Sequence, residues 1–231
     1  MPKLVFDYET TGNHYFETGV RNVVLYVHDG TDYTTGVPWN GVTGITENPS
    51  GAEATPLYAN DHKYLNLISA EEFGATVEAY TFPDEFLECD GGAALASGVT
   101  LGQQPRKRFG LCYRTSVGSD VDPSAANAYK IHLIYGATAA PSEKSYATMN
   151  ESPEAMTLSW ELSTVPISVP GFSNTASITI DSRTVNDAEK MAALEEIIYG
   201  GEGTGKTAHL PTITELTTIF GGATGATGAT S

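Results

Sequence analysis

The residues that most resemble a chemical motif in this chain are the eight from Gly200 to Thr207, GGEGTGKT. They satisfy the spacing G-x-x-x-x-G-K-[ST], in which backbone N–H groups and a lysine hold the phosphates of a nucleotide. That chemistry requires a strand before the loop and a helix that begins near the lysine. Here the predicted helix, 186–199, precedes the loop, and Pro211 falls inside the helix that the motif requires. The context argues against a nucleotide site and favours a loop in which Gly200 ends the helix.

A second group with possible chemistry is the acidic run PDEFLECDGG, which places four carboxylates between Asp84 and Asp90. Hard cations such as Ca²⁺ bind several oxygen ligands, so a surface metal site is one interpretation. The spacing matches no calcium-binding loop, and a solvated acidic turn is the favoured interpretation. The five histidines and two cysteines also lack the spacing of a metal site or a catalytic set. We therefore expect no catalytic residue, metal or cofactor, and no enzymatic activity.

The net charge of the chain argues against functions that require binding to nucleic acid or to anionic membranes. Twelve basic and twenty-eight acidic residues give the 231-residue chain a formal net charge of −16. Such a chain repels nucleic acid and anionic membranes, so a DNA- or RNA-binding role is disfavoured on electrostatic grounds. The sequence shows no signal segment at its start and no apolar run of membrane-spanning length. We expect a soluble protein made in a reducing cytoplasm.

The elements that must position any site are mainly β-strands. Runs with strand composition lie at 3–8, 23–28, 75–82, 108–116, 129–138, 155–165 and 176–181. The run 155–165 alternates, with Met156, Leu158, Trp160 and Leu162 on one face and polar residues on the other. This alternation predicts a strand with one face on a core and one face in water.

One helix is predicted, at 186–199, with Asn186 as its N-cap. Met191, Leu194 and Ile198 fall on one side of it, so we expect it to cover a sheet. The glycines after the helix predict a mobile link to the segment 210–220, with Lys206 as an exposed charge.

The segment 29–63 loses all periodicity and is rich in Gly, Pro, Thr and Asn. A loop this long inside a compact domain is usually functional or disordered. Its aromatic residues Tyr33, Trp39 and Tyr58 predict a docking arm that anchors on a neighbouring subunit. The alternative is a loop that folds back on its own domain.

The one basic cluster is Arg106, Lys107 and Arg108, in the stretch QQPRKRFG. Three charges are too few for a strong nucleic-acid patch. One interpretation is a basic contact with the acidic surface of a neighbouring subunit, and the other is an ordinary exposed turn.

Four blocks of the sequence, at 63–91, 101–115, 131–166 and 187–200, closely resemble major tail proteins of long, non-contractile-tailed bacteriophages. The blocks include KYLNLISAEEFGATVEAYTF, LGQQPRKRFGLCYRT and DAEKMAALEEIIYG, in that order. The resemblance implies a mainly β tail-tube fold, a sandwich or barrel with one flanking α-helix, a long loop and extended terminal arms. It also implies one tail-tube domain at 1–220, followed by a flexible Gly/Ala/Thr tail at 221–231.

The function implied by the resemblance is structural. Subunits would form hexameric rings that stack into the tail tube, with the loop 29–63 reaching adjacent subunits or rings. The other partners would be a tape measure protein in the lumen, a tail terminator and distal tail proteins. The protein would be assembled in the host bacterial cytoplasm and reside in the virion.

An acidic inner wall would repel phosphates, so that DNA passes through the tube without specific binding. Our lumen-facing candidates are Glu78, Glu154 and Glu161, which lie on predicted strands or beside one. The alternative function is a receptor- or glycan-binding β-sandwich, or another accessory module of the virion.

Overall fold

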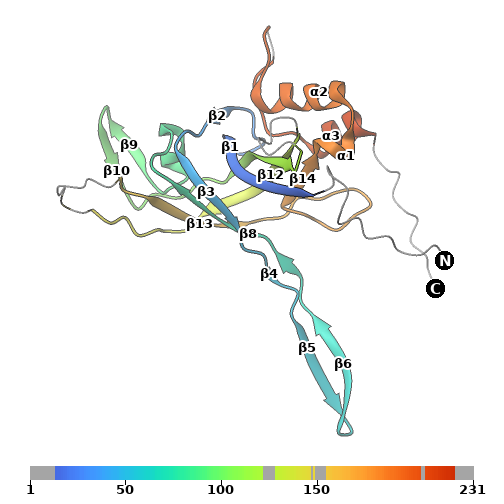
Figure 1. The fold of residues 1–231 in the computed structure, drawn as a ribbon. Coiled ribbons are helices and arrows are strands. Elements are labelled where there is room, and N and C mark those ends of the chain that lie inside the picture. Colours follow the sequence, from blue (N-terminus) through green and yellow to red (C-terminus); the bar gives the residue numbers. More distant parts are fainter. Residues whose placement is uncertain (1–13, 122–127, 147, 149–154, 204–205, 222–231) are drawn as a thin grey trace.

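The computed structural model describes residues 14–121, 128–146, 148, 155–203 and 206–221. The predicted strand at 3–8, the candidate Glu154 and the tail from residue 222 onward lie outside these ranges. The described chain is mainly β, as predicted, and is built on one large antiparallel sheet with a few helices (Figure 1).

Within the described residues, eight strands form the main sheet. They are β1 (Tyr15–Val27), β2 (Gly36–Pro38), β3 (Val42–Glu47), β8 (Gly74–Ala79), β11 (Phe109–Ser119), β12 (Ala128–Ala139), β13 (Leu158–Thr164) and β14 (Ser177–Asp181). Their order is β2-β1-β11-β12-β13-β8-β3, and β14 also pairs with β12. β12 bonds to β14 in its first half and to β13 at its end, so the sheet divides along this strand.

The first core lies between the two halves of this sheet. Leu158, Trp160 and Leu162 of β13 are buried and alternate with polar residues, which confirms the predicted facing of this strand. They pack in one cluster with side chains of β1, β8 and β11. A short 3-10 helix, η1 (Asp84–Glu88), adds Phe86, whose ring lies 5.2 Å from Trp160. Two layers that enclose a core in this way make the fold sandwich-like.

The opposite face of β1, β11 and β12 is covered by helices. These are α1 (Ser182–Val185), α2 (Ala188–Tyr199) and α3 (Ile213–Phe220), so the prediction of one flanking helix is wrong in number. Met191, Leu194 and Ile198 of α2 are buried against the sheet, as predicted. The molecule therefore has three layers, namely two β layers and one layer of helices.

The N-cap of α2 is Asp187 and not the predicted Asn186. The Asp187 carboxylate accepts hydrogen bonds from the backbone N–H groups of Glu189 and Lys190, each at 3.1 Å. Asn186 ends α1 instead, in a left-handed conformation with φ of 46°. Because Asn186 is used as the C-cap of α1, the next residue, Asp187, is the N-cap of α2.

Helix α3, which was not predicted, begins with a capping box. The Thr212 hydroxyl accepts from the Glu215 backbone N–H at 3.3 Å, and the Glu215 carboxylate accepts from the Thr212 N–H at 2.8 Å. Pro211 precedes this cap, where its missing N–H costs nothing. The segment 210–220, expected at the end of a mobile link, thus carries a capped helix.

Substituting Thr212 with Ala is expected to lower the free energy of unfolding by about 0.5–2 kcal/mol, because a helix N-cap bond is lost. Urea unfolding monitored by circular dichroism measures this change. Thr217→Ala, on the exposed side of the same helix, is the matched control and should stay within about 0.5 kcal/mol of the wild type. Equal stability of the Thr212 variant and the wild type would refute the capping role.

A long two-stranded projection leaves the sandwich between β3 and β8 (Figure 1). It consists of the pair β4 (Ser50–Gly51) and β7 (Glu71–Glu72), and then the hairpin of β5 (Ala54–Ala59) and β6 (His62–Ile68). Its tip turns at Asn60 and Asp61, which both have positive φ, as a tight hairpin turn requires. We call residues 50–72 the arm. Part of the expected loop 29–63 forms β2 and β3 of the main sheet instead, and the arm extends beyond residue 63.

A second and smaller hairpin, β9 (Ala93–Ala96) and β10 (Val99–Leu101), lies on another side of the body, next to η1 in the chain (Figure 1).

Candidate assembly surface

Every residue of the arm, from Ser50 to Glu72, is exposed. Its large apolar side chains are nevertheless numerous, and Tyr58, Tyr64 and Ile68 are about 70% exposed. The full apolar set is Leu57, Tyr58, Tyr64, Leu65, Leu67 and Ile68. An isolated hairpin is marginally stable in water, and exposed apolar groups at this density mark an interaction site. The arm is therefore suited to bind another protein surface.

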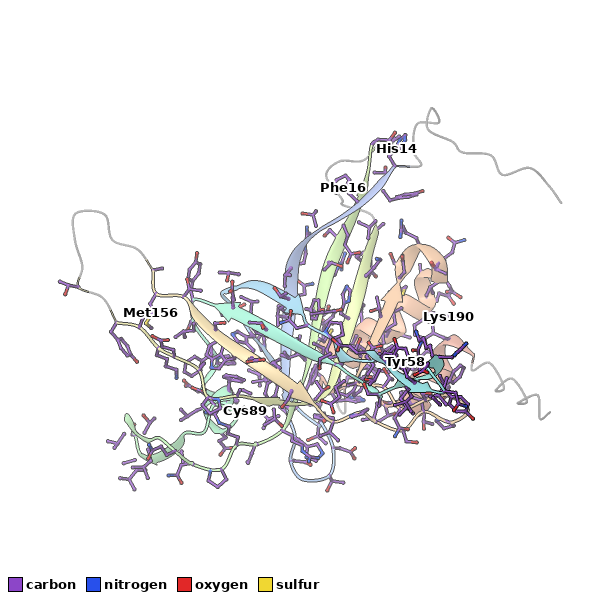
Figure 2. All side chains as sticks on the ribbon, turned by 90° about the horizontal axis from the view of Figure 1, so that it is seen from below. His14, Phe16, Tyr58, Cys89, Met156 and Lys190 are labelled. Carbon is purple, nitrogen blue, oxygen red and sulfur yellow. The ribbon has the colours of Figure 1, made fainter. Side chains whose placement is uncertain are left out.

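The end of β1 forms a second exposed feature. β1 and β11 run past the sandwich, and Figure 2 shows His14 and Phe16 at this end of the molecule. The Phe16 ring lies over Gly118 of β11, where a Cβ would come within 2.5 Å of the ring. His14 Nδ1 lies 3.2 Å from an Asp120 carboxylate oxygen, which ties the two strands together at their tip.

Of the three aromatic residues predicted to anchor on a neighbour, two fold back on their own domain. Trp39 is 3% exposed, donates from Nε1 to the Thr81 carbonyl at 2.8 Å and packs on Phe86. Its prediction as an inter-subunit contact is wrong, because the core leaves it almost no free surface. Tyr33 is half-buried, and its hydroxyl oxygen accepts from the Gly136 N–H at 2.9 Å. Only Tyr58 lies on the arm.

The three residues of the basic cluster, Arg106, Lys107 and Arg108, differ in their contacts within the chain. Arg106 donates to the Ala139 carbonyl at 3.1 Å and lies 3.5 Å from Asp90, so its guanidinium is held by contacts within its own domain, and its role as a subunit contact stays a prediction. Lys107 pairs with Glu88 at 2.5 Å but keeps about half of its side chain exposed. Arg108 is exposed and forms no ion pair with any residue that the structure describes.

Glu78 and Glu161 come from neighbouring strands and share one face of the sheet. In the β8–β13 register Glu78 lies opposite Ser159, and Glu161 lies opposite Thr76. Both carboxylates are exposed, whereas the alternate residues Val77 and Trp160 are buried in the core. The structure thus brings these two candidates together on the outer face of β8 and β13. The third candidate, Glu154, lies outside the described residues.

β3 is the last strand of the main sheet and lies beside these carboxylates. It pairs with β8 through residues 42–47, and among the described residues no further strand pairs with its other edge. β14 likewise pairs only with β12 in the described part of the chain. Unpaired edge strands present backbone donors and acceptors to another chain, so native proteins usually cover them.

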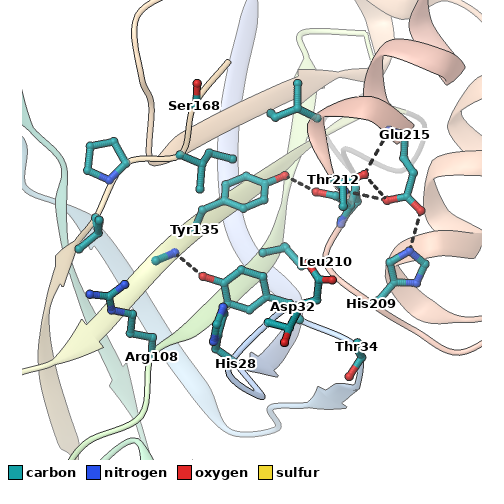
Figure 3. A pocket seen from close by; sticks show the side chains of 18 residues that line it. His28, Asp32, Thr34, Arg108, Tyr135, Ser168, His209, Leu210, Thr212 and Glu215 are labelled. Atoms are coloured by element: carbon teal, nitrogen blue, oxygen red, sulfur yellow. Dashed lines mark hydrogen bonds and ion pairs between the residues drawn. The ribbon is translucent and has the colours of Figure 1, made fainter. Parts of the chain in front are cut away.

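A cavity of about 700 Å³ lies beside the C-terminal segment (Figure 3). Its polar groups bond mainly to one another: the Tyr135 hydroxyl donates to the Pro211 carbonyl at 2.8 Å, and His209 Nε2 lies 2.9 Å from Glu215. Burial raises the pKa of the Tyr135 hydroxyl, so this phenol stays protonated. Apolar side chains such as Leu210 and Ile213 line the cavity together with these polar groups.

The His209–Glu215 pair predicts a pH dependence of stability. Burial alone lowers the pKa of His209, but hydrogen bonds to the Thr207 carbonyl and to Glu215 outweigh it and raise that pKa. Burial alone raises the pKa of Glu215, and the bonds to Thr212 and His209 outweigh it and lower that pKa. The histidine therefore stabilises the fold below its ordinary pKa near 6.5, and loses this effect as the pH rises through its folded value. The carboxylate stabilises the fold above its ordinary pKa and loses this effect in acid.

We expect the wild-type melting temperature to fall between pH 5.5 and pH 8 by more than that of His209→Gln, because the substitution removes the titrating group. Calorimetry at the two pH values measures the difference, with His62→Gln on the exposed arm as the control. Parallel profiles for the wild type and His209→Gln would contradict the pairing.

The loop that begins at Gly200 follows a helix, as predicted. Gly200 ends α2 with φ of 79°, and Lys206 forms an ion pair with Glu196 of α2. The lysine is exposed, as expected, but its charge is paired within the chain. Residues 204–205 lie outside the described ranges.

The described residues contain no group of three or more His, Cys, Asp or Glu side chains that could hold a metal ion. None of the helices in the described ranges has the length and apolar character needed to cross a membrane. Cys89 and Cys112 are buried and unpaired with each other, and burial raises the pKa of the Cys89 thiol to about 12.

No family model and no curated protein matches the sequence. Among solved structures, the PVC sheath-tube complex of an extracellular contractile injection system in its extended state aligns with 75% of this chain. The alignment covers 93% of that chain at 11% identity, with a TM-score of 0.35. The sheath/tube terminator of the same kind of system aligns with 76% of this chain and 99% of its own, at 12% identity and a TM-score of 0.33. Similarity at this level is too distant to carry a function, which has to be inferred from the chain itself.

Proposed function

We propose that this chain is a structural subunit of a phage-type tail tube, and not an enzyme. The observation that carries the proposal is the arm, which exposes six large apolar side chains on a hairpin whose residues are all exposed. Burying such a side chain gives about 1.5–3 kcal/mol, so an arm docked on a second copy is strongly favoured over a free one. The resemblance of four sequence blocks to major tail proteins of non-contractile-tailed phages supports the same function.

Lateral assembly is the second part of the proposal. The unpaired edge of β3 adds to a strand of the next subunit, and repetition of this contact closes a ring of six. Stacked rings then form the tube, in which other tail components (a tape measure protein, a tail terminator and distal tail proteins) are the partners. The virion is the proposed location, after assembly in the host cytoplasm.

The outer face of β8 and β13 is the proposed lumen wall. Glu78 and Glu161 lie on this face, and a ring of subunits repeats both carboxylates around the axis. The repeated negative charge repels the phosphates of DNA, so the duplex slides through without binding. The helices, on the far side of the middle β layer, then face away from the lumen.

Electron microscopy of the purified protein tests the assembly. We expect rings or tubes in negative stain, and a sedimentation coefficient that increases with protein concentration. Particles that remain monomeric at all concentrations, together with specific adsorption to cells or sugars, would instead support a receptor- or glycan-binding module.

A charge reversal tests the lumen wall. Glu161→Lys is expected to leave assembly intact, since the side chain is exposed, and to slow DNA release from virions, since every subunit then attracts phosphate. The matched control is Glu189→Lys on α2, which reverses the same charge on the helical side. Equal rates of DNA release from the two variants would refute the lumen assignment.

A further inference from the structure

A trough lies between β2, η1 and the β9–β10 hairpin. Its volume is about 430 Å³. The residues that line it and matter here are the apolar Val27, Val37, Leu87 and Ala94, and the acidic Asp84 and Glu85. Both of these carboxylates are exposed, and neither forms an ion pair with a described residue. We call this feature the β2–η1 trough.

The trough and the arm lie at opposite ends of the same two strands. β3 is preceded by β2 and continues into the arm, while β8 emerges from the arm and is followed by η1. β3 and β8 are paired side by side over residues 42–47 and 75–79. Figure 1 accordingly shows β2 at the top of the body and the arm projecting from the bottom.

The arm tip carries a cation that forms no ion pair with another described residue. Among the described residues, every lysine and arginine except Arg21, Lys63 and Arg108 forms an ion pair. Lys63 lies directly opposite Tyr58 in the hairpin register. Cross-strand partners project from the same face of a hairpin, so this face presents an aromatic ring beside a positive charge.

We propose that the β2–η1 trough receives the arm tip of a second copy of this chain. Tyr58 contacts the apolar walls, and Lys63 pairs with Asp84 and Glu85 at the rim. This inference rests on the proposed function and assigns the partner surface of the arm. The complementarity has two parts, because an aromatic and basic tip meets an apolar and acidic recess.

The contact joins two different surfaces, so it is head-to-tail. A heterologous contact whose two sides lie at opposite ends of the subunit repeats without closing on itself. Each copy then has an arm at one end and a trough at the other. Repetition of this single arm–trough contact is enough to extend the stack along the tube axis.

Charge reversal tests the pairing. Lys63→Glu alone, and Asp84→Lys with Glu85→Lys in one chain, are each expected to raise the critical concentration for polymerisation at least about tenfold, the effect of losing a close interfacial charge pair. The chain that carries all three substitutions should polymerise like the wild type. An equimolar mixture of the two defective proteins should also polymerise, because each arm then finds a trough of opposite charge. Arg21→Glu, which reverses another unpaired and exposed cation, is the control and should have no effect.

Analytical ultracentrifugation and negative-stain microscopy give the readout, and unchanged melting temperatures show that each variant folds. If Lys63→Glu polymerises normally, or if neither the triple variant nor the mixture recovers, the assignment of the trough is overturned while the tube function stands. If the wild-type protein itself forms no polymer, the proposed function fails first.

Discussion

Replacing residues 52–70 with Asn-Gly is expected to abolish polymerisation and to leave the fold of the monomer intact. Gly51 and Glu71 are cross-strand partners, so a two-residue hairpin turn fits between them. No residue of the arm is buried, and the free energy of unfolding should therefore change by no more than about 0.5 kcal/mol. Urea unfolding and electron microscopy of the same preparation measure the two properties.

The matched control for this deletion is Phe172→Ser, which removes an exposed aromatic side chain far from the arm in the sequence. It should polymerise like the wild type. Tubes formed by the deletion protein would show that the arm is dispensable, and would remove the observation on which the proposed function depends. Loss of the folded monomer would show that the arm supports its own domain.

The second large effect is expected from Trp160→Ala, which should lower the free energy of unfolding by about 3–5 kcal/mol. Trp160 is fully buried in the first core, where its ring lies 5.5 Å from Trp39 and 5.7 Å from Phe82. Its Nε1 also donates to the Asp90 carboxylate at 3.1 Å, and the substitution removes this donor. Chemical unfolding followed by circular dichroism measures the loss.

Trp160→Phe separates the two contributions, because it keeps a ring in the core and deletes only the hydrogen bond and part of the volume. We expect a loss below that of the alanine variant. Trp160→Ala with wild-type stability would mean that Trp160 does not hold the two β layers together.

Six of the eight strands in the main sheet, all except β2 and β3, could be predicted at least in part because their signals are local. In β13 the alternation of Leu158, Trp160 and Leu162 with polar residues is written in seven consecutive positions. The buried side of α2 is likewise determined by the spacing of its own apolar residues. An apolar repeat of this kind reflects only which face of a single helix or strand is buried, so it can be recognised without knowing the neighbouring elements.

The segment 29–63 could not be assigned in the same way. Trp39 is buried because Phe86 and Trp160, which are distant in sequence, form a pocket around it. No local pattern separates it from Tyr58, which has similar neighbours in composition but lies at the arm tip. The second strand of the arm, HKYLNLI, had usable signals in its strand composition and in the Asn60–Asp61 turn before it.

The outward direction of Glu78 and Glu161 could be predicted for each residue separately, but not that the two share one surface. Alternation alone placed Glu78 and Glu161 on outward faces of two strands, and the structure shows both outward. That the two strands are neighbours follows from the pairing of β8 with β13, a long-range contact without local signal. Helix α3 was missed because it is short and rich in threonine and follows a proline, so its capping box was the only clear sign.

The arm, built from two short ladders, β4–β7 and β5–β6, is joined to two hydrogen-bonded strands, β3 and β8. In the proposed stack, a force that pulls along the tube acts on each subunit at the arm and at the β2–η1 trough. The strands β3 and β8 connect these two sites and carry the force along their length. Strands loaded along their length share the force among many ladder bonds in shear, whereas peeling would break the bonds one at a time. A column of such subunits would resist stretching through its covalent backbone and sheet ladders, and would bend mainly at the seams between copies.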